Sequence, residues 1–128
     1  MAGPSFATSG LISSFPVAGN SELYALSAAA ELSVSGFRPA MTTWKHAFAA
    51  GSAQASPTLD CARPFPSGAG ISGRPGTLYL PLGDGTVAAV IVESRRLDQT
   101  AEWPKYQRDA YNSGNATSVG ESLNPGCP

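Results

Sequence analysis

The chain has 128 residues, a formal net charge of −1, apolar residues at 42% of its positions and charged residues at 13%. Such a length favours a single domain that folds around its own core, and the apolar content excludes disorder throughout. The near-neutral charge gives no electrostatic footprint for specific nucleic-acid binding, which depends on clustered Lys and Arg.

The charged fraction is about half of the roughly 25% usual in soluble domains. A surface built from Ser, Ala, Gly, Thr and Pro indicates that much of it meets other protein. Secretion is the alternative explanation for the same composition.

Residues 1–20 are expected to form an extended N-terminal arm, since they carry no charged side chain and are interrupted by prolines and glycines. The apolar side chains expected to contact neighbouring subunits are Phe6, Leu11, Ile12, Phe15 and Val17. The arm lacks the basic stretch that opens a secretory signal, and the apolar runs of the chain are too short to span a membrane. We therefore expect a protein made in the cytoplasm, unless a signal peptide was removed.

Residues 21–34 are expected to form a helix. Apolar side chains recur there at the spacing of one helix face, at Leu23, Leu26 and Ala30, and the alanine run favours helix as well. Two short strands are the alternative, because apolar residues alternate with serines from position 32 onward.

Residues 40–50 are expected to form a second short helix, whose aromatic residues Trp44 and Phe48 would pack onto a sheet. Residues 51–76 are dominated by Ser, Ala, Pro and Gly and are expected to form a long loop. A loop of this length inside a compact domain usually has a function or is held by a partner.

The densest apolar run, residues 77–92, is expected to form a β-hairpin at the centre of the fold. Leu78, Leu80 and Leu82 fall on one face of its first strand. The Gly-Asp-Gly sequence at 83–85 follows, and glycine supplies the positive φ that a tight hairpin loop needs.

The second strand of this hairpin is apolar on both faces, so we expect a central strand covered on both sides, with Val90 and Ile91 deeply buried. Pro81 donates no backbone hydrogen bond. The first strand is therefore expected to lie near a sheet edge or to end its pairing at this proline.

Charged side chains of both signs are concentrated in residues 93–109, which indicates a solvated face. Pro104 could open a short helix that ends at Tyr111, and residues 112–128 are expected to form a second extended arm. A mainly β fold is predicted, with α+β as the alternative. It comprises one globular domain over residues 21–111, with a small antiparallel sheet or sandwich centred on the hairpin and one or two short helices.

No motif for chemistry has the context that it needs. Residues 68–73 match GxGxxG but lie between proline-containing segments, where a nucleotide-binding loop requires a strand and a helix. His46 is the only histidine and has no sequence neighbour that would tune it for acid–base catalysis. One histidine and two distant cysteines offer no zinc site. We therefore expect no catalytic residue, no cofactor and no metal.

Cys61 and Cys127 are the only cysteines. A bridge within the chain, cross-links between subunits and two free thiols in a reducing cytoplasm all remain open. Asn115 begins an Asn-Ala-Thr sequence that fits a glycosylation site, which matters only in a eukaryotic secretory route.

These features favour a structural subunit of a large assembly, in concrete form a virion component such as a phage capsid-decorating or tail protein. Its expected partners are copies of itself and other proteins of the assembly, with no specific nucleic acid and no membrane span. A small secreted or surface-exposed binding module that uses the loop 51–76 is the alternative. An enzyme domain with a site completed by another chain is the second alternative.

Overall fold

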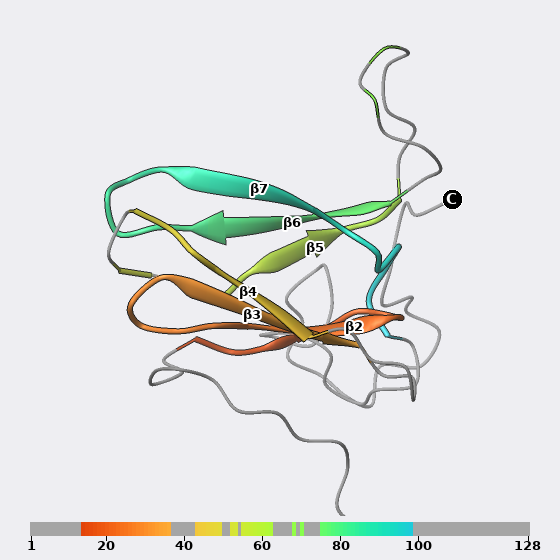
Figure 1. Ribbon diagram of the computed structural model, residues 1–128, viewed down its shortest axis with the longest axis horizontal. Coiled ribbons are helices and arrows are strands. Elements are labelled where there is room, and N and C mark those ends of the chain that lie inside the picture. The colour runs from red at the N-terminus through yellow and green to blue at the C-terminus, as the bar shows by residue number, and fades with distance from the viewer. Residues whose placement is uncertain are drawn as a thin grey trace, which may run out of the picture.

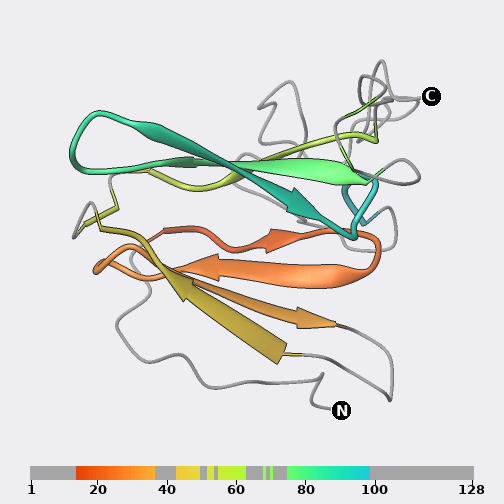
Figure 2. The same ribbon diagram turned by 45° about the horizontal axis from the view of Figure 1, so that its top comes forward.

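The computed structural model describes residues 14–36, 43–49, 52–53, 55–62, 68, 70 and 75–98. These residues form seven strands in two antiparallel sheets, and they contain no helix. The sheets lie as two layers, with β2, β3 and β4 in one and β5, β6 and β7 in the other (Figures 1 and 2). The predicted mainly β fold is confirmed, in its sandwich form.

The first sheet contains four strands in chain order: β1 (Val17–Ala18), β2 (Glu22–Leu26), β3 (Glu31–Gly36) and β4 (Thr43–Ala47). Each strand runs antiparallel to the next, so the sheet is a meander with β1 and β4 at its edges.

The helix predicted for residues 21–34 is wrong, and the alternative of two strands is confirmed. Tyr24 pairs with Val34, and Leu26 with Leu32. All four side chains are fully buried in the core between the sheets. Helix propensity is worth only tenths of a kcal/mol per residue, so burial of this alternating face against the second sheet outweighs it.

The alanine run that favoured a helix forms the turn between β2 and β3. Ser27 N donates to Glu31 O at 2.9 Å, Ala30 N donates to Ser27 O at 3.0 Å, and Ala30 has a positive φ of 60°. The β6–β7 turn repeats this pattern, since Leu82 N donates to Thr86 O and Gly85 N to Leu82 O, with φ 86° at Gly85. The second turn was predictable because it has glycine at the position of positive φ.

The second sheet contains β5 (Thr58–Asp60), β6 (Gly76–Pro81) and β7 (Val87–Val92), with β6 in the centre. The predicted hairpin is confirmed, as β6 and β7 pair residue for residue from Gly76↔Val92 to Pro81↔Val87. Its leucines at 78, 80 and 82 are buried, and Pro81 is the last residue of its strand.

The prediction that β7 is a central strand is wrong, because it lies at the edge of its sheet. Ile91 is 45% exposed and Val90 is only half-buried, so the deep burial predicted for both is also wrong. Only one face of β7 looks toward the other sheet, and successive side chains of a strand point to opposite faces. An apolar sequence on both faces therefore leaves one face of β7 in solvent.

The short helix predicted for residues 40–50 is also wrong, since β4 occupies residues 43–47. Part of the predicted long loop 51–76 is also a strand. It contributes β5, which pairs with β6 from Thr58↔Tyr79 to Asp60↔Thr77. The predicted helix that ends at Tyr111 lies outside the described residues.

The end of the predicted N-terminal arm belongs to the sandwich. Val17 in β1 is fully buried in the core of its own chain. Residues after β7 cross to the same edge, where Leu97 bridges Gly19 and Asp98 N donates to Ala18 O at 2.9 Å. Residues 1–13 and the predicted tail 112–128 lie outside the described part of the chain.

Candidate functional site

An apolar groove of about 420 Å³ lies between the two sheets, along the side where the edge strands β4 and β7 face each other. It is lined by Trp44, His46, Phe48, Ala89, Val90 and Ile91. Three of these residues come from β4 and its end, and three come from β7, so the groove exists only because both sheets have an edge here.

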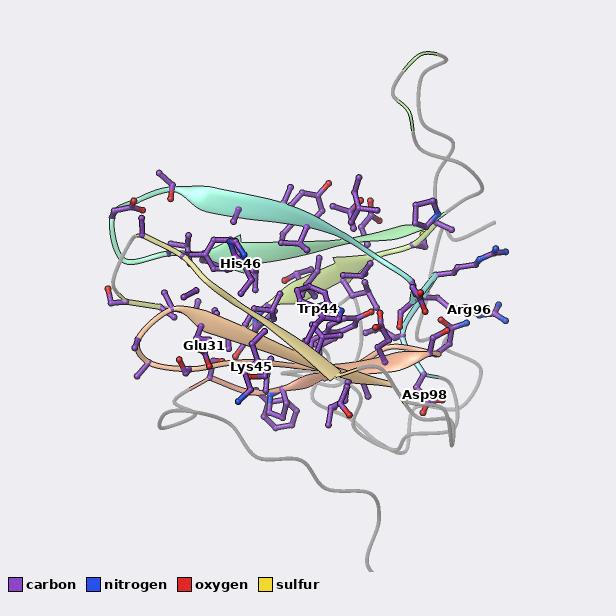
Figure 3. All side chains as sticks on the ribbon, viewed as in Figure 1. Glu31, Trp44, Lys45, His46, Arg96 and Asp98 are labelled. Atoms are coloured by element: carbon purple, nitrogen blue, oxygen red, sulfur yellow. The ribbon has the colours of Figure 1, made fainter. Side chains whose placement is uncertain are left out.

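The period of two in β4 places its ring-bearing side chains in the groove. Figure 3 shows Trp44 and His46 between the two layers, whereas Lys45 lies on the other side of its sheet. Phe48 follows the strand and is held by its backbone, because Phe48 N donates to Ala30 O at 2.9 Å. The charged residue of β4 is thus kept out of the groove.

The His46 side chain packs its ring against that of Phe48. The rings of His46 and Phe48 are 4.7 Å apart and inclined by 73°, an edge-to-face arrangement. No carboxylate or hydroxyl hydrogen-bonds the imidazole in the described part of the chain, and His46 is exposed. Such a site suits the binding of apolar side chains by burial and ring contact. That His46 has no catalytic role stays a prediction.

A second cluster of functional groups is buried inside the sandwich, where β2 meets the end of β7. The Tyr24 hydroxyl donates to Glu22 Oε1 at 2.9 Å, and Glu93 N donates to the same oxygen at 3.2 Å. Ser94 Oγ accepts from the backbone of Ser21 at 3.1 Å and of Glu22 at 3.0 Å. Apart from the bond between Tyr24 and Glu22, these bonds join residues that are more than 70 positions apart in the chain.

Burial dominates the electrostatics of this cluster. It raises the pKa of the Tyr24 hydroxyl far above its usual range, and the nearby Glu22 carboxylate raises it further, because both disfavour the phenolate. Ser94 N donates to the Tyr24 oxygen at 3.4 Å. The hydroxyl therefore keeps its proton, and its hydrogen bonds connect β2 of the first sheet to the residues that follow β7 of the second.

The structure does not bring the other candidate residues from the sequence together into a site among the described residues. Gly68 and Gly70 of the GxGxxG pattern are exposed, with positive φ and open space around them, and the rest of the pattern lies outside the described residues. No group of three or more His, Cys, Asp and Glu that could hold a metal ion occurs among the residues described. The same residues include no helix long and apolar enough to cross a membrane.

The residues predicted to contact other subunits are divided by the fold. Val17 is inside the core, and Phe15 is 36% exposed, with its backbone N donating to Ser56 Oγ at 2.8 Å. Phe6, Leu11 and Ile12 lie outside the described residues. Cys61 is buried and is not a free thiol. Cys127 and Asn115 lie outside the described residues, so a bridge from Cys61 to Cys127 within the chain and a cross-link between subunits both stay predictions.

Comparison with known proteins adds no functional assignment. No family model, curated protein or solved structure matches this chain. Its possible functions must therefore be argued from its own surface and chemistry.

Neither the groove nor the buried cluster around Tyr24 and Glu22 was predicted from the sequence, for different reasons. For the groove, the sequence did contain an indication. Trp44, His46 and Phe48 alternate with Lys45 and Ala47, and this period of two is typical of a strand. For the buried cluster, it contained no such indication. Glu22 and Ser94 are 72 residues apart, and each taken alone looks like an ordinary surface residue.

Proposed function

We propose that this chain is a structural subunit of a large protein assembly, in concrete form a virion component such as a phage capsid-decorating or tail protein, and that it resides in the assembled particle. The observation that carries the proposal is the outward face of the second sheet. Three large apolar side chains stand on it in solvent: Tyr79 at 39% exposure, Val87 at 63% and Ile91 at 45%.

These side chains form one continuous surface. Tyr79 pairs with Ala89 across the β6–β7 ladder, and Val87 and Ile91 flank Ala89 at alternate positions of β7. No charged residue occurs in β6 or β7. Contiguous apolar surface without charge is typical of a protein–protein contact.

The magnitude of the effect favours repeated contacts. Full burial of one Val, Ile or aromatic side chain contributes about 1.5–3 kcal/mol, while ordering and association costs offset much of that gain. A few such side chains make a weak contact by themselves. Many copies in a fixed arrangement would add these weak contacts, as an assembly does.

Low charge supports the same proposal. Charged residues make up only 13% of the chain, and residues 1–21 carry none. The N-terminal segment, with Phe6, Leu11 and Ile12, would extend the apolar contact surface beyond the sandwich. The expected partners are copies of this chain and other proteins of the assembly.

A small secreted or surface-exposed binding module is the second candidate, and two observations favour it. Cys61 is not a free thiol, which suits an oxidising compartment. The groove beside β7 offers the aromatic rings of Trp44 and Phe48 to a ligand or peptide. This candidate uses the groove in a monomer, whereas the structural subunit uses the outer face in a particle.

Electron microscopy of the purified protein tests the proposal. We expect ordered particles or filaments, formed by the chain alone or with the other proteins produced alongside it. A protein that remains a dispersed monomer under all conditions, and joins no particle, would contradict the assembly function and favour the binding module.

A further inference from the structure

The free edge of β7 is the least protected strand edge in the sandwich. Within the described residues, β7 pairs with β6 on one side and with no strand on the other. A free edge presents unpaired N–H and C=O groups that can pair with another strand.

The hydrogen-bond pattern of the hairpin identifies which groups these are. Leu82 N donates to Thr86 O, so Leu82 and Thr86 form a hydrogen-bonded pair. Such pairs alternate along an antiparallel ladder, which makes Tyr79↔Ala89 a non-hydrogen-bonded pair in the continuous register. The backbone groups of Ala89 therefore point away from β6, and those of Val87 and Ile91 do the same.

The other three edges of the sandwich are protected by known devices. β4 carries Lys45 in its middle, β5 is three residues long, and β1 is two residues long with Leu97 beside it. Charges and short length are common means of preventing edge pairing. β7 has six residues, Val-Ala-Ala-Val-Ile-Val, with no charge, no proline and no bulge in its register.

We propose that β7 pairs antiparallel with β7 of a second copy of this chain, around a two-fold axis at Ala89. The inference rests on the proposed function, because it names one contact by which such a subunit joins its copies. The two sheets that contain β5, β6 and β7 become one continuous sheet across the axis.

Backbone and side chains select the same register. With Ala89 opposite Ala89 of the partner subunit, Val87 lies opposite Ile91 of the partner subunit. All of these residues have outward-pointing backbone groups, so each pair exchanges both hydrogen bonds. A shift by one residue would pair outward with inward backbone groups and would join opposite faces of the two sheets.

The side chains suit this self-pairing. Ala89 has little bulk at the axis, and the β-branched side chains of Val87 and Ile91 meet on both sides of it, a favourable cross-strand pair. No charged residue lies in the strand, so no like charges face each other across the axis. The groove borders the same edge, and the partner subunit's groove would face it and cover the half-buried rings of Trp44 and Phe48.

Charge placed at the axis tests both the contact and its register. In sedimentation equilibrium, we expect the wild-type protein to dimerise. Ala89→Lys and Ala89→Asp should each raise the dimer Kd by about tenfold or more, because like charges then face each other. An equimolar mixture of the two variants should recover association, since Lys then meets Asp only in the register centred on Ala89.

Thr58→Lys is the matched control, because Thr58 lies in the same cross-strand row as Ala89 but at the opposite edge of the sheet. Thr58 is exposed, and the Thr58→Lys substitution should leave the dimer Kd unchanged. Circular dichroism should show the same fold for all variants. A monomeric wild type, an Ala89→Lys protein that dimerises as the wild type does, or a mixture that stays dissociated would each overturn the proposal.

Microscopy separates this inference from the proposed function. If the wild type dimerises through residue 89 but joins no particle, the β7 contact stands and the assembly function fails. If particles form equally well from wild type and Ala89→Lys, the assembly function stands and the β7 contact fails.

Discussion

The Tyr24 hydroxyl donates a 2.9 Å hydrogen bond to the carboxylate of Glu22, two positions earlier on the same face of β2. Both side chains are buried, Tyr24 at 0% and Glu22 at 6% exposure. Through Glu93 and Ser94 the pair connects the first sheet to the end of β7, so this short-range contact helps to fix a long-range one.

Removal of the Glu22 carboxylate should destabilise the fold. Glu22→Ala leaves the Tyr24 hydroxyl and the Glu93 amide without an acceptor, and a buried unsatisfied group costs about 1–3 kcal/mol. Glu22→Gln keeps an acceptor oxygen and should lose less. The free energy of unfolding in urea measures both variants. Equal stability of Glu22→Ala and wild type would show that the cluster does not lock the sheets.

The buried Tyr24 should make the fold sensitive to alkali. Its pKa is raised in the folded state, so the unfolded chain releases the phenolic proton first. The contribution to stability is fully present below about pH 10, the pKa of an unperturbed tyrosine, and falls as pH rises further, by up to about 1.4 kcal/mol per pH unit.

Urea unfolding at several pH values above and below this point measures the slope. Tyr24→Phe should flatten it. Tyr79→Phe is the control, because it removes an exposed ring hydroxyl and leaves the buried cluster intact. A slope that persists in Tyr24→Phe would mean that another group titrates with unfolding.

The turn of the β6–β7 hairpin should depend on glycine at position 85. Its φ of 86° is unfavourable for a residue with a side chain, whereas the space around it is open. Gly85→Ala should therefore cost about 1–2 kcal/mol from the backbone alone. Gly85→Asn should cost less, because asparagine tolerates this conformation. Thermal unfolding compares the two variants, and equal melting temperatures for Gly85→Ala and wild type would contradict the prediction.

The N-terminal segment should be needed for assembly but not for folding. Deletion of residues 1–13 keeps β1 and Val17, so circular dichroism and thermal unfolding should match the wild type while incorporation into particles weakens. Deletion of residues 1–20 removes Val17 from the core and should destabilise the domain as well. Undiminished incorporation after the shorter deletion would remove the segment from the proposed contacts.

Cysteine pairing can be read from a non-reducing gel. We expect a faster monomer band that shifts on reduction, which indicates a bridge from Cys61 to Cys127 within one chain. A ladder of multimers would indicate cross-links between subunits. An unchanged monomer band would contradict the oxidised state found at Cys61, and the Cys127→Ser variant identifies its partner.

The sequence by itself determined the β6–β7 hairpin. Gly85 supplies the positive φ of the turn, and leucines at alternate positions mark the buried face of the strand, so both signals act within a few residues. The general class of the fold followed from such local patterns. The apolar character of the N-terminal segment and the low charge of the chain were also evident from the sequence.

Tertiary structure alone decided the remainder. The sequence of residues 21–34 is compatible with a helix and with a hairpin. The hairpin is favoured because the facing sheet buries side chains at alternate positions, such as Tyr24 and Leu32. The sequence of β7 is apolar on both faces, but its position at an edge decides that Ile91 meets solvent. Glu22 meets Ser94 because the chain closes a loop of 72 residues, and no local pattern encodes that distance. Local conformational preferences act over a few residues, whereas burial and hydrogen bonding depend on which segments the whole fold brings together.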